Sequence, residues 1–574
     1  MDFYKGVINI LFYDFEVFKY NWLVVLIDVQ KQKIWRIHDD PEELRQVYEE
    51  YKLDVWVGFN SNHYDQYILK AILLSIDPKK VNDYIIIQNR AGYSYDSEFY
   101  KIKYIGYDCI NAVKAGRSLK QLEGFMGNSI HETSVPFDID RPLTAAEIEE
   151  TFSYCEDDVK NTIEVFYNSI DDFKAVLSLI RTFNLPLTYV SKTKAQLSAI
   201  ILNCQKTDFP SHFDITIVPT LKIGKYTDVL RFYENYFDYN SSLETEIAGI
   251  IHKFGIGGVH GARSNYHHKG LLIHVDVTSY YPSMMLKYGF LTRASQTPEK
   301  YREIYNTRVA LKKAGKKAEQ APYKIVLNGT YGIAKDETST AYDPLQANNI
   351  CINGQLLLVD LIDKLESIDG FELIQSNTDG LIIKIPDTDK HFNQLDDICY
   401  EWEQRTGMGL GFDYITEIWQ KDVNNYVFRF DDGKLERKGS YVMELNELDN
   451  DLPIVNKAIV DYLTQGIPVE TTINTCNDLK QFQMICKISS KYKALFHGDL
   501  QLTEKCVRVF ASKDNSDKGL KKLHNKKNKP DKFPNSPANC FIDNGNVNGK
   551  PVPDKLDREF YISMAKERAS GFGI

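Results

Sequence analysis

The chain has 574 residues, which is enough for three to five domains of ordinary size. Hydrophobic residues make up 43% of the composition and charged residues 26%, which indicates a globular protein with several apolar cores. The formal net charge of −10 argues mildly against a nucleic-acid partner, although DNA responds to the local potential and not to the sum over a chain. The nine cysteines include no CxxC pair, so zinc ribbons and disulfide frameworks are not expected.

Scattered thiols of this kind are typical of a protein of the reducing cytoplasm. The N-terminus has an acidic residue at position 2 and only a short apolar run, so we expect neither a signal peptide nor a membrane span. A lysine-rich stretch stands out near the C-terminus. Two interpretations of it stay open, a solvated mobile loop or a surface that contacts phosphate groups. Its lysines are Lys513, Lys518, Lys521, Lys522, Lys526, Lys527, Lys529 and Lys532.

In chain order, apolar runs first predict strands over residues 7–13, 22–28, 33–37 and 54–59, and the spacing over 64–74 predicts a helix. The second and third of these strands are expected to form a hairpin.

A long helix is predicted over residues 141–168. Thr144 is followed three residues later by Glu147, which is a capping-box pattern at the start of a helix. With the preceding strands, this helix makes residues 1–170 one α/β domain.

The rest of the chain is predicted to be mostly helical over 171–262, ending in a glycine cluster whose simplest role is to turn the backbone. Beyond it, apolar patterning predicts further elements. Strands are expected at 271–277, 372–375, 380–385, 425–430 and 434–443, and helices at 299–319, 322–333, 346–366, 453–465 and 555–569.

A first set of acidic residues lies in the N-terminal domain. Asp14 and Glu16 follow a strand two residues apart, so their side chains point to the same face. Asp65 lies at a strand-to-helix junction, and Tyr154 and Asp158 are four apart on the long helix and share one face. Four converging carboxylates repel one another unless divalent cations neutralise them, which predicts a Mg²⁺ or Mn²⁺ site with oxygen ligands. Two such ions suit phosphodiester hydrolysis.

A second set lies in the middle of the chain. Asp276 follows a buried strand, and Asp379 lies in the turn of a hairpin, so the two carboxylates can meet at the tips of adjacent strands and share two metal ions. Lys324, Asn328 and Tyr331 are spaced i, i+4 and i+7, which places a cation, an amide and an aromatic ring on one helix face.

That face suits a nucleoside triphosphate. Arg308 and Lys312 are four apart on the preceding helix and could add positive charge against the triphosphate.

The ordered patterns DxE, N-x3-YD and Y-x3-D of the first set resemble the DEDDy proofreading exonucleases attached to family B DNA polymerases. The second set, HVDVTSYYPS, KIVLNGTYG and SNTD, resembles motifs A, B and C of those polymerases. The resemblance extends over essentially the whole chain. In the exonuclease set it implies that four carboxylates hold metal ions and that one tyrosine orients the attacking water. The ligands would be Asp14, Glu16, Asp65 and Asp158, and the tyrosine Tyr154.

In the polymerase set the resemblance implies that Asp276 and Asp379 are the metal ligands, together with the backbone carbonyl of Val277. Tyr281 would exclude a ribose 2′-hydroxyl, with Tyr280 the next candidate. Lys324 would contact the triphosphate and donate a proton to the pyrophosphate.

The chain departs from the family pattern within the motifs. Asn377 stands where motif C usually has its first Asp, Gly329 replaces a Ser of motif B, and Tyr280 replaces a Leu of motif A.

Two linking motifs also differ. The Tyr-x-Gly-Gly segment between the two enzyme halves appears as 255–258 without its Tyr, and the Lys-x-Tyr motif that grips the primer end appears as 424–426 without its Lys. Lys421 or Lys438 could supply the missing charge.

The expected fold is therefore α/β and α+β, multidomain, with an RNase H-like exonuclease domain followed by a right-hand polymerase. The boundaries are 1–170 for the exonuclease, 171–265 for a connecting helical region, 266–298 and 336–440 for the palm, 299–335 for the fingers and 441–574 for the thumb and C-terminal region.

The resemblance implies a DNA-directed DNA polymerase that adds dNTPs to a primer 3′-OH, with 3′–5′ exonuclease proofreading. Each active site would use two Mg²⁺ ions, with Mn²⁺ able to substitute. The partners would be primer-template DNA, single-stranded DNA in the exonuclease site and other replication proteins, with no membrane. The compact size is typical of bacteriophage or mobile-element replicases, which would place the protein in the cytoplasm of an infected bacterium.

Two alternatives stay open. One is a dedicated exonuclease whose polymerase half is degenerate and only binds DNA, and Asn377 is the feature that favours it. The other is a non-catalytic replication scaffold.

The connections between the motifs are short, with residues 286–323 between the first two. They leave little room for the insertions of protein-primed relatives, so we expect extension of an ordinary nucleic-acid primer.

Overall fold

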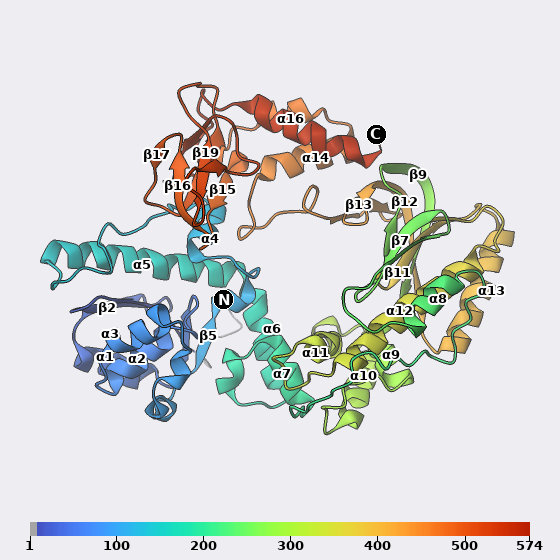
Figure 1. Ribbon diagram of the computed structural model, residues 1–574, viewed down its shortest axis with the longest axis horizontal. Helices are drawn as coiled ribbons and strands as arrows, with labels where there is room; N and C mark the ends of the chain where they lie inside the picture. The colour runs from blue at the N-terminus through green and yellow to red at the C-terminus, as the bar shows by residue number, and fades with distance from the viewer. Residues whose placement is uncertain (1–8, 574) are drawn as a thin grey trace. The chain divides into compact units, whose positions relative to one another are not determined.

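The computed structural model describes residues 9–573 (Figure 1). The chain forms two compact units. The first contains the chain up to Thr193 with Leu445–Ile454 and Thr475–Tyr561, and the second contains Lys194–Glu444, Val455–Asn474 and the residues from Ile562 onward. The predictions for the first eight residues, the start of the first strand and the absence of a signal peptide, lie outside the described residues. Between residues 9 and 573, no helix has the length and apolarity needed to cross a bilayer.

The first unit is built on a five-stranded sheet with the order β3-β2-β1-β4-β5. The pairs β3-β2 and β2-β1 are antiparallel, whereas β4 and β5 run parallel to β1. Figure 1 shows α5 on one side of this sheet and α1, α2 and α3 on the other. The strands are β1 (Ile10–Val17), β2 (Trp22–Asp28), β3 (Lys33–His38), β4 (Val55–Gly58) and β5 (Gly106–Asp108). The helices are α1 (Pro41–Tyr51), α2 (Asp65–Leu73), α3 (Pro78–Asn82), α4 (Leu119–Met126), α5 (Ala145–Asn168) and α6 (Ile170–Thr182).

Helices on both faces explain why every residue of β2 is buried. The predicted hairpin of β2 and β3 and the capping box of α5 are confirmed, since the Thr144 hydroxyl accepts from the Glu147 amide at 3.3 Å. The prediction that Asp14 and Glu16 follow the first strand is wrong. Strand β1 continues to Val17, because β2 supplies hydrogen-bonding partners along that whole length.

The C-terminal part of the first unit contains two small antiparallel sheets. One has the order β15-β18-β21 and the other β17-β16-β19-β20. Strands β19 and β20 belong to the lysine-rich stretch, so a mobile loop is the wrong description of those residues. The strands are β15 (Met484–Lys487), β16 (Tyr492–His497), β17 (Leu500–Gln501), β18 (Cys506–Ala511), β19 (Leu520–His524), β20 (Asp531–Lys532) and β21 (Cys540–Ile542).

The second unit is built on a nine-stranded sheet with the order β14-β13-β12-β9-β11-β10-β8-β7-β6, and its neighbours are antiparallel. An apolar core on the sheet contains Leu272, Ile374, Ile382 and Ile415. The strands are β6 (Leu243–Ile247), β7 (Ile250–Phe254), β8 (His260–Ala262), β9 (Tyr266–Val277), β10 (Glu372–Asn377), β11 (Gly380–Lys384), β12 (Leu410–Asp422), β13 (Asn425–Phe430) and β14 (Leu435–Lys438).

The remaining helices belong to the second unit, except for α14, α15 and α16, each of which has residues in both units. A single helix over 299–319 is not formed, because Gly315, at a φ of 72°, separates α10 from α11. The helices are α7 (Lys194–Ile201), α8 (Thr227–Glu234), α9 (Tyr280–Lys287), α10 (Pro298–Lys313), α11 (Lys317–Lys335), α12 (Pro344–Leu365), α13 (Asp389–Thr406), α14 (Pro453–Gln465), α15 (Val469–Thr475) and α16 (Arg558–Ala569).

The prediction of a mostly helical segment over 171–262 is wrong for its second half. Residues 205–226 form neither helix nor strand, and 243–262 contribute three strands. Polar side chains of the buried helix α12 accept hydrogen bonds from backbone amides of the irregular segment. Asn349 Oδ1 accepts from the amide of residue 216 at 2.9 Å, and Asn353 Oδ1 accepts from that of residue 218 at 2.9 Å. These hydrogen bonds satisfy backbone amides that would otherwise need a partner within a helix or a sheet.

Candidate active sites

The acidic residues of the first set meet at the sheet of the first unit. Asp14 and Glu16 lie on β1, Asp65 is the first residue of α2, and Asp158 lies on α5. The amide of Phe15, between the two acids of β1, donates to Asp65 Oδ1 at 3.1 Å. Glu16, Asp65 and Asp158 are all buried.

The pKa of each of these four carboxylates is raised. Burial is the largest cause for each, and for Asp14 the charges of Asp65, Glu16 and Asp158 add to it. Burial raises the pKa of Asp65 to about 7. Four carboxylates that resist ionisation together fit a site for divalent cations, whose charge would relieve the repulsion.

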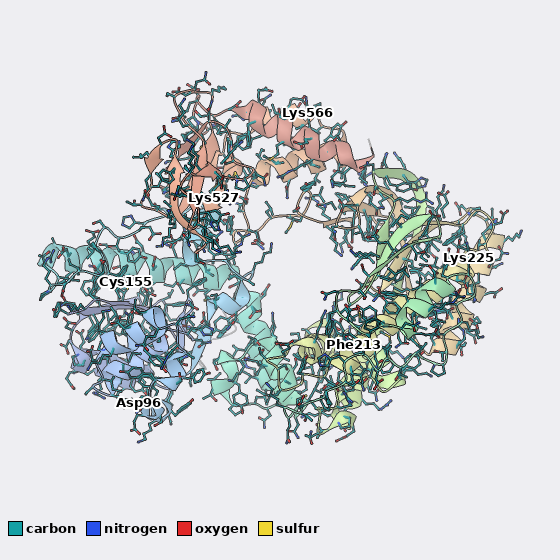
Figure 2. The ribbon with its side chains drawn as sticks, viewed as in Figure 1. Asp96, Cys155, Phe213, Lys225, Lys527 and Lys566 are labelled. Carbon is teal, nitrogen blue, oxygen red and sulfur yellow. The ribbon has the colours of Figure 1, made fainter. Side chains whose placement is uncertain are left out.

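Cys155 lies on α5 next to this acid cluster (Figure 2). Donor atoms of Asp14, Glu16 and Cys155 lie within 4.8 Å of one another. Burial raises the pKa of the Cys155 thiol well above its usual range, and its Sγ donates to the Asp14 carbonyl oxygen at 3.3 Å. Burial therefore disfavours the thiolate form of Cys155, whereas the carboxylates supply the oxygen ligands that Mg²⁺ prefers.

Lys120 of α4 was missed by sequence reasoning. Its Nζ lies 2.6 Å from Asp158 Oδ1 and 3.1 Å from Glu123 Oε1, and 4.5 Å from the centre of the Tyr154 ring. Burial lowers the pKa of Lys120, but the negative charges of Asp158 and Glu123 outweigh this effect, so the pKa of Lys120 is raised overall. No local pattern marks this lysine, since it comes from a short helix far from the acidic motifs in sequence.

The loop before Asp65 is held by Asp108 of β5. Its carboxylate accepts from the amides of Asn60 at 2.7 Å and Asn62 at 2.9 Å. Asn60 has a φ of 63°, a conformation that asparagine tolerates better than most residues. This explains an asparagine at the start of the N-x3-YD pattern.

In the second unit, Asp276 and Asp379 lie on neighbouring chain segments. Asp276 is on β9, paired with Gly380 at the start of β11, and Asp379 is in the turn just before that glycine. The amide of Val277 donates to the Asp379 carbonyl oxygen at 2.8 Å. The structure thus brings together the two carboxylates that the sequence predicts to meet.

The electrostatics of this pair resemble those of the acid cluster. Burial and the charge of Asp379 raise the pKa of Asp276 to about 6. Burial also raises the pKa of Asp379, while His274 and Lys438 oppose the shift. Two mutually repelling carboxylates fit a divalent cation between them. His274 was not recognised from the sequence, because a lone histidine in a strand carries no signal.

Two aromatic rings lie close to this carboxylate pair. Tyr281 of α9 packs on Tyr331 of α11 with ring centres 4.6 Å apart. Tyr280 is 3% exposed and its hydroxyl donates to the Gly354 carbonyl oxygen at 2.6 Å. Tyr281 is the less buried of the two adjacent tyrosines.

The cations predicted to bind a triphosphate lie on α10 and α11. Arg308 Nη1 donates to Ser279 Oγ of motif A at 2.9 Å, and Lys312 is close enough to Asp276 to lower its pKa. Lys324 and Asn328 are exposed on α11.

The turn of motif C is supported by the glycine segment. A Cβ on Gly258 would lie 2.4 Å from Thr378 Oγ1, and the Thr378 amide donates to the residue 259 carbonyl oxygen at 3.0 Å. Asn377 pairs with His260 across β10 and β8, and its side chain acts on the pKa of His260 and of Tyr426.

Of the two lysines considered for the missing charge of the Lys-x-Tyr motif, Lys438 is the better placed. It pairs with Tyr426 across β13 and β14 and acts on the pKa of Asp379. Lys421 instead forms an ion pair with Asp422 at 2.9 Å.

Comparison with known proteins gives partial similarity. No family model matches the chain. A protein named DNA polymerase 1 from Sulfurisphaera ohwakuensis is 26% identical over 198 residues, 34% of this chain and 21% of the relative. Another of that name from Saccharolobus solfataricus is 25% identical over 199 residues, again 34% and 21%. The chain thus matches about a fifth of the length of these curated relatives.

Among solved structures, the family B DNA polymerase from the hyperthermophilic archaeon Pyrobaculum calidifontis aligns with 98% of this chain and 77% of its own. The sequence identity is 15% and the TM-score is 0.41.

Proposed function

We propose that the chain is a DNA-directed DNA polymerase of family B with a 3′–5′ proofreading exonuclease of the DEDDy type. The observation that carries the proposal is the pairing of Asp276 with Asp379, tied by the 2.8 Å bond from the Val277 amide. It is supported by the order of the motifs along the chain and by the partial similarity to proteins named DNA polymerase 1.

In the polymerase site, Asp276, Asp379 and the Val277 carbonyl would hold two Mg²⁺ ions, or Mn²⁺ in their place. When bound, these ions would lower the pKa of the primer 3′-hydroxyl and neutralise the charge on the transferred phosphoryl group. Lys324 would contact the triphosphate of the incoming dNTP, and Tyr281 would exclude a ribose.

The side chains of Arg308, Lys312, Asn328 and Tyr331 would complete the nucleotide site. Arg308 already bonds motif A through Ser279, so a triphosphate here would meet a positioned guanidinium.

In the exonuclease site, Asp14, Glu16, Asp65 and Asp158 would hold the metal ions, and Tyr154 would orient the attacking water. Lys120 would balance the charge of Asp158, its partner in the metal-free protein. The strand order β3-β2-β1-β4-β5, with helices on both faces, supports an RNase H-like interpretation of this unit.

The wider assignments remain part of the proposal. Strands β9 to β14 of the nine-stranded sheet would belong to the palm, α10 and α11 to the fingers, and residues 441–574 to the thumb and C-terminal region. A primer-template DNA would be the substrate, and the compact chain would belong to the bacteriophage type.

The direct test supplies a primed single-stranded template, dNTPs and Mg²⁺ without other proteins. Extension by the wild type and none by Asp379→Asn would support the polymerase assignment. Removal of dNTPs should then leave 3′-end degradation.

A second candidate is a dedicated exonuclease with a degenerate polymerase half. The neutral Asn377 beside Asp379 is the observation that favours it. This candidate predicts degradation without extension in the same assay.

A further inference from the structure

A buried arginine of the C-terminal region is bonded to helix α4 of the exonuclease unit. Arg508 of β18 is 0% exposed, and among the described residues no carboxylate forms a salt bridge with it. Its guanidinium is surrounded by carbonyl oxygens instead. Nη2 donates to Gly124 O at 3.0 Å and to Asn128 O at 2.7 Å, and Nη1 donates to Gly545 O at 2.6 Å.

These bonds complete the end of a helix. The last carbonyls of any α-helix lack partners within the helix. Gly124 O lies in the last turn of α4 and also accepts from the amide of the C-cap residue Gly127 at 3.1 Å, whereas Phe125 O accepts from Gln483 Nε2 at 3.0 Å. Gln483 Oε1 in turn accepts from Arg508 Nε at 3.0 Å. A positive charge at this end also complements the helix dipole.

The first turn of the same helix carries Lys120, which bonds Asp158 of the predicted exonuclease site. Strand β18 reaches this turn as well, because Cys506 Sγ lies 3.7 Å from the Lys120 carbonyl oxygen. Residues 506 and 508 of one strand therefore contact both ends of α4.

Helix α4 has only eight residues, too few to be stable without tertiary contacts. In an α-helix the amide of one residue bonds the carbonyl four residues earlier, so movement of the last turn is passed directly to the first turn of so short a helix. The direction of Lys120 thus depends on what holds the C-terminal end of α4.

We infer that Arg508 is a positioning residue of the exonuclease site, acting through α4 on Lys120. The inference rests on the proposed exonuclease function. It means that part of the predicted thumb region is required to build the degrading site.

The test is a double-mutant cycle between Arg508→Met and Lys120→Met, read as kcat and KM for degradation of 3′-labelled single-stranded DNA. Arg508→Met alone should lower kcat by about 10- to 100-fold, as expected for a misplaced active-site group, with less change in KM. In the Lys120→Met background the same change should lower kcat by less than about twofold, because the residue that it positions is gone.

Primer extension and the melting temperature distinguish positioning from a general loss of stability. Arg405→Met is a matched control, since Arg405 is a largely buried arginine of the other unit, bonded to Asp360 at 2.8 Å and to the Thr220 carbonyl. It should lower the melting temperature without reducing degradation below that temperature. Arg508→Met should spare primer extension.

The inference would be overturned if the effects of Arg508→Met and Lys120→Met on kcat simply multiplied in the double variant. It would also be overturned if Arg508→Met reduced DNA degradation and primer extension equally. If Arg508→Met does not fold, Gln483→Leu removes the bond to Phe125 and should show the same coupling to Lys120. A wild-type enzyme that degrades no DNA would overturn the proposed function and this inference with it, whereas degradation without coupling would overturn the inference alone.

Discussion

The amide of Val277 donates a hydrogen bond to the carbonyl oxygen of Asp379 at 2.8 Å, so the residue after the first predicted metal ligand is tied to the second ligand itself. This bond fixes the spacing of the two carboxylates through the backbone. Burial raises the pKa of both groups, and the charge of Asp379 raises that of Asp276 further. A site organised in this way before metal binds has little left to rearrange.

The two activities are expected to be separable, since the two carboxylate sets lie in different units of the chain. Asp14→Ala with Glu16→Ala should reduce 3′-end degradation by about 100-fold or more, because it removes charge that stabilises the reacting phosphate and its ions. Primer extension should be largely unchanged. If the double variant still digests single-stranded DNA from the 3′ end, the exonuclease residues are assigned wrongly.

Tyr281 should discriminate against ribonucleotides. Replacing it with Val removes a ring that packs on Tyr331 and should raise rNTP incorporation relative to dNTP by at least about tenfold. The measurement is the ratio of kcat/KM for the two nucleotides.

Tyr280→Phe is the matched control for that experiment. It removes a buried hydrogen bond to the Gly354 carbonyl, worth about 1 kcal/mol of stability, and should leave sugar selectivity unchanged. Altered selectivity in Tyr280→Phe but not in Tyr281→Val would place the gate at residue 280.

The strands and helices near the sites follow closely from sequence pattern. Strand β2 and helix α14 have the predicted bounds, and the Thr144 capping box forms as expected, because local periodicity and capping decide such elements. Lys120 and residues 205–226 were not predictable in this way. Lys120 reaches Asp158 only through tertiary packing, and the irregular segment depends on side chains of α12 more than a hundred residues away.

The stability of the metal-free protein should fall as pH rises toward 7. The pKa of Asp65 in the folded protein is raised to about 7, so the folded state binds more protons than the unfolded chain between about pH 4 and pH 7. Protonated Asp65 contributes its full stabilisation below about pH 4. This contribution is lost as the pH rises to about 7, and it amounts to about 1.4 kcal/mol for each unit by which folding raises the pKa.

Melting curves with EDTA from pH 5 to 7.5 measure this effect. Asp65→Asn keeps an acceptor for the Phe15 amide and should flatten the decline, and Mg²⁺ should restore the wild type at pH 7.5. The exposed Asp138→Asn is the control and should leave the slope unchanged. A wild-type slope retained in Asp65→Asn would contradict this account of the acid cluster.

Asn377 should tolerate replacement by Asp. Its side chain lies close enough to His260 and Tyr426 to act on their pKa, and both of these groups can donate to a carboxylate, so the new charge would be partly satisfied. Primer extension should be similar or greater, with a changed preference between Mg²⁺ and Mn²⁺. An inactive Asn377→Asp enzyme would mean that the site requires a neutral residue here.

The lysine-rich sheet should contribute to DNA affinity. Residues 487–532 hold twelve lysines and one arginine but only five acidic residues. Lys527 near the β19–β20 turn pairs with Asp531 (Figure 2), whereas Lys526, Lys529 and Lys532 form no ion pair among the residues described. Changing these three to Gln should weaken binding and reduce the salt slope by about 1 for each lysine–phosphate interaction that the change removes.

The control for that slope replaces three lysines far from this sheet in the sequence, each of which already pairs with the acidic residue three positions earlier, Lys52, Lys101 and Lys174. Binding of duplex DNA measured over a range of salt concentrations gives both slopes. Equal slopes for the wild type and the sheet variant would show that this surface does not bind phosphate.

Single-turnover extension of a labelled primer on a single-stranded template tests directly whether Asp276 and Asp379 form a polymerase site. The assay contains Mg²⁺, dNTPs and the Asp14→Ala/Glu16→Ala variant, so that degradation does not hide the product, and no other protein. We predict extension to the template end, and loss of extension by roughly 100- to 1,000-fold when Asp379→Asn is added. Failure to extend any oligonucleotide, or extension that survives Asp379→Asn, would show that these two carboxylates do not form a polymerase site.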